Sequence, residues 1–180
     1  MNTYISLLRG INVTGNKVIK MADLQKLYES LKFKNVQTYI ASGNVVFQSP
    51  ETDVQKLRRK IQKKIQEKFG FDVGILVITP KQLEKAIKQN PFPNAKPNML
   101  CFNFLSEAPA NVPMDEINAR KDPAEQVKII GDVLYHHCPI GFGKTDVTNA
   151  FLEKKLNVVA TARNWNTVNK LLEMGKEKPI

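Results

Sequence analysis

The chain has 180 residues, 42% of them hydrophobic, with two cysteines and a formal net charge of +10. A chain of this length buries about two-thirds of its unfolded surface in an ordinary core, so the fold needs no disulfide staples. No apolar segment is long enough to span a bilayer, and Arg9 interrupts the first apolar run, which argues against a secretory signal. We therefore expect a cytoplasmic protein without a membrane partner, in a compartment that keeps Cys101 and Cys138 reduced.

Residues 1–79 predict the order strand, helix, strand, turn, strand, helix, strand. Apolar residues recur every three or four positions between Val54 and Phe69, and Gly70 follows as a helix terminator. Ser42-Gly43-Asn44 is a small polar turn in which glycine supplies the positive φ of a tight hairpin. The expected strands are 4–8, 36–41, 45–48 and 73–78, and the expected helices are 21–31 and 54–69.

The second half of the chain repeats this order more faintly. Its expected elements are a strand at 100–105, a short helix at 114–119, a hairpin of strands 127–130 and 133–136, and a segment that begins at Thr145 and ends in a strand at 156–159. The hairpin turns at Gly131-Asp132, and the triplet Thr-Asp-Val occurs at 52–54 and again at 145–147. We interpret the two halves as an internal duplication of a βαββαβ unit, an α+β fold with mostly antiparallel sheets and a C-terminal helix.

Three prolines within residues 89–98 separate the two copies, because proline breaks helices and central strands. We expect a first unit at 1–89, a proline-rich linker at 90–98, and a second unit with the C-terminal helix at 99–180.

The helix expected at 54–69 is strongly basic. Between Asp53 and Lys68 only Asp53 and Glu67 are acidic, against Lys56, Arg58, Arg59, Lys60, Lys63, Lys64 and Lys68. Clustered lysines gain affinity for polyanions by releasing counterions, which points to nucleic acid or another anionic partner. The alternative is a solvated helix face on which lysine serves solubility. The sequence leaves both interpretations open.

In a βαββαβ unit three loops must lie at the same end, namely residues 9–17, the hairpin 42–44, and residues 69–72. The first loop combines glycines, asparagines and cations at the entrance to a helix, where unpaired N–H groups favour an anion. It is not a nucleotide-hydrolysing Walker loop, because Lys17 comes one residue late and Val18 replaces the hydroxyl residue. The alternative is that Gly10 and Gly15 only shape the turn.

A second polar cluster covers residues 161–167, after the last expected strand and before a helix with Trp165 on its apolar face. Arg163, Asn164 and Asn166 exceed what one helix cap requires, although capping by Thr161 or Asn164 is the simpler use. This cluster joins the Arg9 loop only if the two copies pack head to tail.

Cys101 and His136 are expected on neighbouring strands, so a cysteine–histidine nucleophile is geometrically conceivable. A thiol in an apolar strand is usually inert, however, and Ser42, lacking an assigned base, fits a turn former. Strand alternation places His137 on the opposite face from His136 and Cys138, so we expect no metal site. No cofactor is expected.

Three short stretches carry a family resemblance: 8–13 (Leu-Arg-Gly-Ile-Asn-Val), 42–47 (Ser-Gly-Asn-Val-Val-Phe) and 161–167 (Thr-Ala-Arg-Asn-Trp-Asn-Thr). Together with Asn90-Pro91-Phe92 they resemble the bacterial family called "domain of unknown function 1697". The resemblance extends almost to Gly175 and implies a cytoplasmic, duplicated α+β domain of ferredoxin-like character, with no established activity. The signature residues matched are Arg9, Gly10, Asn12, Ser42, Gly43, Asn44, Arg163, Asn164, Trp165 and Asn166. Thr14 stands where the family often has glycine, which stiffens the first loop.

The leading expectation is a binding module for an anionic ligand, either a phosphorylated metabolite or nucleic acid. The expected ligand-binding residues are Arg9, Gly10, Asn12, Lys17, Ser42, Gly43, Asn44, Arg163, Asn164 and Asn166. Two alternatives stay open: a small-molecule enzyme that uses a cleft between the two units, and a non-catalytic structural or regulatory interaction domain. The sequence decides neither the reaction nor the oligomeric state.

Overall fold

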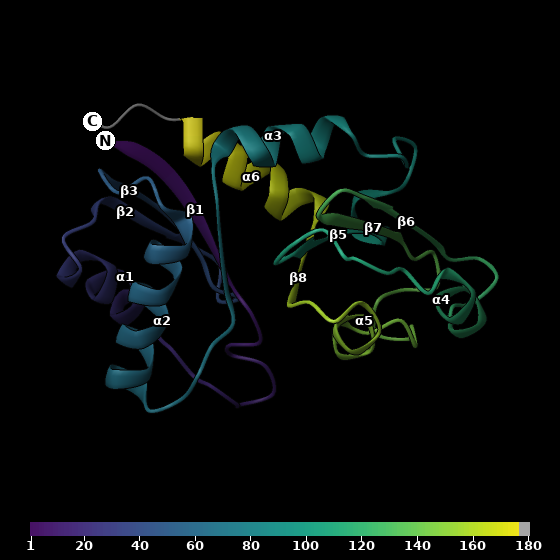
Figure 1. Cartoon of the computed structure of the whole chain (residues 1–180), viewed down its shortest axis with the longest axis horizontal. Helices are drawn as coiled ribbons and strands as arrows, with labels where there is room; N and C mark the ends of the chain where they lie inside the picture. The colour runs from purple at the N-terminus through teal and green to yellow at the C-terminus, as the bar shows by residue number, and fades with distance from the viewer. Residues whose placement is uncertain (177–180) are drawn as a thin grey trace. The chain divides into compact units, whose positions relative to one another are not determined.

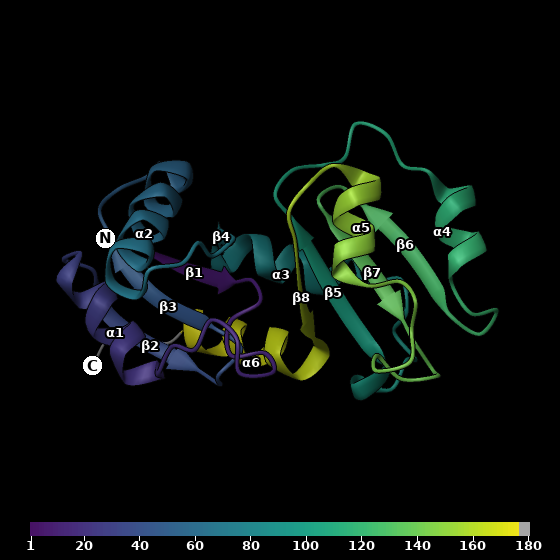
Figure 2. The same ribbon diagram turned by 90° about the horizontal axis from the view of Figure 1, so that it is seen from below.

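The computed structural model describes residues 1–176, which fold as two four-stranded antiparallel sheets with helices (Figures 1 and 2). Among the described residues, one compact unit comprises Met1–Glu84 together with residues 170–176, and the other comprises Lys85–Asn169. The predicted α+β class is confirmed.

The first unit has the strand order β2-β3-β1-β4, and every neighbouring pair is antiparallel. This order is that of a ferredoxin-like fold, as the sequence implied. Helices α1 and α2 lie on one side of the sheet (Figures 1 and 2), where Leu24, Leu27, Leu57 and Ile61 share a core with Tyr4. The elements are β1 (Asn2–Leu8), α1 (Met21–Ser30), β2 (Lys34–Tyr39), β3 (Asn44–Ser49), α2 (Val54–Phe69) and β4 (Ile75–Ile78).

The second unit repeats this topology with the strand order β6-β7-β5-β8, again antiparallel throughout. The predicted duplication is therefore confirmed. Its helices contribute Ile117, Leu152 and Leu156 to a core with Leu105 and Leu134 of the sheet. The elements are β5 (Leu100–Leu105), α4 (Met114–Arg120), β6 (Gln126–Ile130), β7 (Val133–His137), α5 (Asn149–Leu156) and β8 (Ala160–Asn164).

The last strand lies later in the chain than the sequence predicts. We expected it at 156–159, but α5 continues to Leu156, and Asn157 ends that helix with a φ of 54°. The strand β8 begins at Ala160 and pairs with β5, Arg163 lying opposite Phe102. Arg163 is therefore part of the sheet, and the polar cluster at 161–167 begins within a strand and not after it.

Two short helical elements were not predicted, α3 (Pro80–Lys88) and η1 (Pro97–Met99). Helix α3 begins with a capping box, in which the Thr79 hydroxyl accepts from the Gln82 amide and the Gln82 side chain accepts from the Thr79 amide. The predicted C-terminal helix is α6 (Trp165–Lys176).

The compact units divide the chain between Glu84 and Lys85 and again between Asn169 and Lys170. The end of α6 groups with the first unit because Gly175 packs closely on Pro80 and Ile5, and Lys176 pairs with Glu84 at 2.6 Å. The predicted linker at 90–98 lies inside the second compact unit.

The first hairpin depends on Gly43, the last residue of the connection between β2 and β3. Its φ is 88°, a conformation that residues with a side chain rarely adopt. A Cβ atom at this position would lie 2.7 Å from Ile11 Cδ1 and 2.8 Å from Leu8 Cβ. The hairpin backbone therefore packs directly on the end of β1.

We expect Gly43→Ala to lower the free energy of unfolding by about 2–5 kcal/mol, because left-handed strain and overpacking add together. Gly131→Ala in the second hairpin is the matched control, since Gly131 also has a positive φ (61°) but its added Cβ would meet nothing within 4 Å. The control should lose only about 1–2 kcal/mol. Urea denaturation of both variants measures the difference, and equal losses would contradict the close packing.

Candidate functional site

The three loops that the sequence places at one end of the first unit do meet. The Leu8 amide donates to the Gly43 carbonyl at 2.8 Å, and the Arg9 amide donates to the Gly74 carbonyl at 2.8 Å. The Lys17 ammonium donates to the carbonyl of Asp72 at 2.7 Å. The loop after β1, the first hairpin and the loop before β4 are thus joined by hydrogen bonds.

Asn12 is the centre of this junction. Its side-chain amide donates to the carbonyls of Ile19 at 3.0 Å and Ala41 at 2.7 Å, and its carbonyl oxygen accepts from the Ile19 amide at 2.8 Å. The backbone of Asn12 has a φ of 55°, which asparagine tolerates better than most residues. One side chain therefore closes its own loop and ties that loop to the hairpin.

The other loop residues predicted to bind a ligand lie nearby. Asn44 is buried at the start of β3, and its amide donates to the Tyr39 carbonyl at 2.9 Å and to the Ser42 hydroxyl at 3.0 Å. Gly10 is exposed with a φ of 68°, and Arg9 is half-buried. Thr14 has a φ of 48°, a conformation that β-branched residues rarely adopt. Much of the polar chemistry here holds the loops together.

The second predicted cluster lies in the other unit. The Arg163 side chain is only 7% exposed, its Nη1 donates to the Ala162 carbonyl at 2.8 Å, and burial lowers its pKa to about 10. Asn164 caps α6, because its side-chain oxygen accepts from the Thr167 amide at 2.9 Å. Asn166 is exposed on the first turn of α6. The capping role that the sequence suggested for Asn164 is present.

Cys101 and His136 are direct neighbours across β5 and β7, as expected. Burial, with a smaller contribution from Cys138, raises the pKa of the Cys101 thiol to about 12. Burial also lowers the pKa of His136. A thiol with this pKa stays protonated at neutral pH, so the pair is poorly suited to nucleophilic attack.

His136 and His137 lie on opposite faces of β7, as alternation predicted, but His136 has a partner that sequence spacing alone does not show. Its Nε2 lies 2.5 Å from the carboxylate of Glu125, which also accepts from the Thr145 hydroxyl at 2.8 Å. Glu125, His136 and Cys138 are all buried, and their donor atoms lie within 4.8 Å of one another. The register of the β6–β7 hairpin is the feature that could have revealed this cluster. Gln126 pairs with His137, and this brings the adjacent residues Glu125 and Cys138 together.

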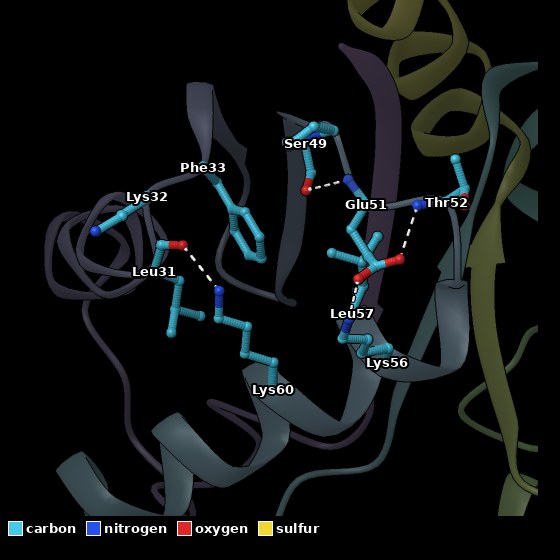
Figure 3. A pocket seen from close by; sticks show the side chains of 10 residues that line it. Leu31, Lys32, Phe33, Ser49, Glu51, Thr52, Lys56, Leu57 and Lys60 are labelled. Atoms are coloured by element: carbon cyan, nitrogen blue, oxygen red, sulfur yellow. Dashed lines mark hydrogen bonds and ion pairs between the residues drawn. The ribbon is translucent and has the colours of Figure 1, made fainter.

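The first unit also contains a hollow of about 500 Å³ (Figure 3). Two of its lysines, Lys56 and Lys60, come from successive turns of α2. Lys60 lies 5.5 Å from the ring centre of Phe33 and donates to the Leu31 carbonyl at 3.2 Å. The lining residues are Leu31, Lys32, Phe33, Ser49, Pro50, Glu51, Thr52, Lys56, Leu57 and Lys60.

Glu51 is the acidic residue of this pocket. Lys56 lies 2.6 Å from its carboxylate, and this hydrogen bond is the main reason that the pKa of Glu51 is lowered and that of Lys56 is raised. The same carboxylate accepts from the amides of Thr52 and Asp53 at 3.0 and 3.1 Å. Glu51 thereby balances one of the three lysines that line the pocket.

The family described as "Protein of unknown function (DUF1697)" matches residues 1–135, so the chain belongs to this family. A solved structure of a conserved bacterial protein from Streptococcus pneumoniae is similar to it, with a TM-score of 0.70 and 22% sequence identity over 97% of this chain and 98% of that chain. At this identity the similarity shows the fold alone. No curated protein matches the sequence. Within residues 1–176 no helix is both long and apolar enough to cross a membrane.

The Asn12 junction generates a stability prediction. Asn12→Ala removes three hydrogen bonds and should lower the free energy of unfolding by about 2–4 kcal/mol. Asn16→Ala is the control in the same loop, because the exposed Asn16 side chain makes no hydrogen bond within the described residues, and it should change stability by less than about 0.5 kcal/mol. Thermal and urea unfolding of the two variants compare them, and a neutral Asn12→Ala would show that the junction contributes nothing.

Proposed function

We propose that this protein binds an anionic ligand, a phosphorylated metabolite in preference to nucleic acid, in the pocket lined by Lys32, Lys56 and Lys60. The observation that supports this most is the coincidence of three lysines with a hollow of about 500 Å³. Pockets for small molecules commonly measure about 300–1,000 Å³ and combine apolar walls with a few polar groups. Phe33 and Leu57 supply such walls here.

The anion is expected to bind through lysine ammonium groups and not through the helix terminus. The first amides of α2 already have an acceptor, because the Asp53 carboxylate accepts from the amides of Gln55 and Lys56 at 2.8 and 3.2 Å. The Lys56–Glu51 pair is no obstacle, since exposed ion pairs contribute only about 0–1 kcal/mol. A phosphate with nearly two negative charges competes well with one carboxylate for Lys56.

A small ligand fits the pocket better than a long polyanion does. The hollow of about 500 Å³ has the volume of a site for a small molecule. Outside the pocket Lys63 and Lys64 lie 4.0 and 3.7 Å from Glu67, and Lys68 donates to the Asp23 carbonyl at 3.3 Å. Nucleic acid binding is the rival outcome of the test below.

The loop around Arg9 was the site expected from the sequence, and anion binding there stays a prediction. The proposal uses the pocket because Lys32, Lys56 and Lys60 line one hollow, whereas the Arg163 side chain of the second predicted cluster is largely buried. A cytoplasmic location is also part of the proposal, supported by the free thiols of Cys101 and Cys138.

The test compares two double variants of the full chain. Lys56→Gln with Lys60→Gln should weaken binding of inorganic pyrophosphate about tenfold to thirtyfold, since each ion pair near the surface contributes about 1 kcal/mol. Lys63→Gln with Lys64→Gln removes the same charge from the same helix outside the pocket. This second double variant should weaken pyrophosphate binding less than about threefold. Calorimetric titration at low and high salt gives both affinities.

Equal losses in the two double variants would show that only the net charge matters and would contradict a built site. Absence of pyrophosphate binding at millimolar concentration would also contradict the proposal. Tighter binding of a short single-stranded RNA than of pyrophosphate, lost equally in both variants, would favour the nucleic acid alternative.

A further inference from the structure

The second unit buries three side chains of different chemistry at one point. Glu125, His136 and Cys138 are 1%, 2% and 0% exposed, and one donor atom from each lies within 4.8 Å of the other two. None of them belongs to the lysine pocket, which lies in the first unit.

The duplication shows how unusual this group is. The pair Lys34 and Gln48 in β2 and β3 corresponds to the pair Gln126 and His137 in β6 and β7. By this register Glu125, His136 and Cys138 occupy the places of Phe33, Phe47 and Ser49 in the first unit. In the first unit two of these places hold aromatic rings whose centres lie 4.5 Å apart within the hydrophobic core. Where the first unit has an aromatic pair, the second has a carboxylate and an imidazole.

The Glu125 carboxylate needs a positive partner that the described residues do not supply as lysine or arginine. Its contacts are the His136 ring at 2.5 Å, the Thr145 hydroxyl at 2.8 Å, and the Asp122 amide at 3.4 Å. A buried carboxylate without a cation is costly, because the interior solvates its charge poorly. A divalent cation among these atoms would balance the charge.

The Cys138 thiol is fully buried, and burial, together with the nearby Glu125 carboxylate, raises its pKa, so without a metal it stays protonated. A bound metal ion reverses this preference, because a coordinating thiol is deprotonated outright. The Thr145 hydroxyl donates to the Glu125 carboxylate at 2.8 Å. Thr145 therefore holds one of the three donor groups in place.

We infer that Glu125, His136 and Cys138 form a binding site for Zn²⁺. Thiolate, imidazole and carboxylate are the three ligand types of zinc in proteins, and a soft thiolate disfavours Mg²⁺ and Ca²⁺. The three donor atoms lie no more than 4.8 Å from one another. An ion at the centre of such a triangle is within roughly 2.8 Å of each atom, and zinc–ligand distances are about 2.0–2.3 Å. Each donor atom therefore needs to move by less than about 1 Å to bind the ion.

Zinc binding replaces one set of contacts with another. The ion takes the place of the proton between His136 Nε2 and Glu125 Oε2, the ring stays neutral with its proton on Nδ1, and the Cys138 thiol releases its proton to solvent. A water molecule completes the tetrahedron, and Thr145 remains as an outer partner of the ligands. The edge-on contact of Phe142 with the His136 ring, at 5.3 Å between centres, excludes bulk water on that side.

Titration of the full chain with Co²⁺, followed by displacement with Zn²⁺, tests the site. Co²⁺ reports its own ligands, because a thiolate ligand gives a charge-transfer band and a tetrahedral site gives intense visible bands. We expect one equivalent of Co²⁺ to give both signals and Zn²⁺ to abolish them. Cys138→Ser should abolish the charge-transfer band, and Cys101→Ser, which changes the other cysteine of the same sheet, should leave it intact.

Glu125→Gln keeps the shape of the side chain and tests the carboxylate separately. The substitution should lower the affinity for Zn²⁺ by more than the roughly 10–100-fold that loss of an outer partner costs. Competition with a chelator measures this affinity. Circular dichroism verifies that each variant folds, and if Cys138→Ser does not fold, the wild-type band and the Glu125→Gln affinity decide the question.

Absence of the charge-transfer band in the wild type would overturn the inference and leave Glu125 and His136 as a buried hydrogen-bonded pair. The same conclusion follows if Cys138→Ser retains the band or if Glu125→Gln binds Zn²⁺ as tightly as the wild type.

Discussion

The close approach of one hairpin to the end of a strand is the constraint on which the first unit depends. The backbone at Gly43 lies against Leu8 and Ile11 with no room for a Cβ, and the Leu8 amide donates to the Gly43 carbonyl. Asn12 then ties the following loop to the hairpin through Ala41. Asn12 and Gly43, two residues on which the family resemblance rests, therefore have a physical role in closing the fold.

The topology could be predicted from the sequence because its signals are local. Apolar periodicity and turn glycines give the order of strands and helices, and that order implies which loops meet. Helix α3 was missed although Thr79 and Gln82 form a capping box, and β8 was placed too early because the burial of Arg163 depends on pairing with a distant strand. The lysine pocket and the role of Glu125 were also hidden, since both arise from segments that are brought together only by the folded sheet.

The two copies share one topology but have acquired different chemistry. The first has an aromatic core around Phe33 and an accessible pocket whose cations are Lys56 and Lys60 on α2 and Lys32 after α1. In the second, the corresponding core position contains Glu125 and His136, and the donor atoms are buried. Exposed cations suit a ligand that exchanges with solvent, whereas buried donors of mixed type suit a metal that stays bound. The two proposals therefore concern separate units and are independent of each other.

Native-state hydrogen exchange tests the central claim, that the loop junction is an integral part of the folded unit. The informative amides are those of Leu8, Arg9 and Ile19, which donate to Gly43, Gly74 and the Asn12 side chain. If the junction closes the fold, these amides exchange only by the global unfolding that also exposes the centre of β1. Exchange near the rate of an unstructured chain, with the centre of β1 still protected, would contradict the account.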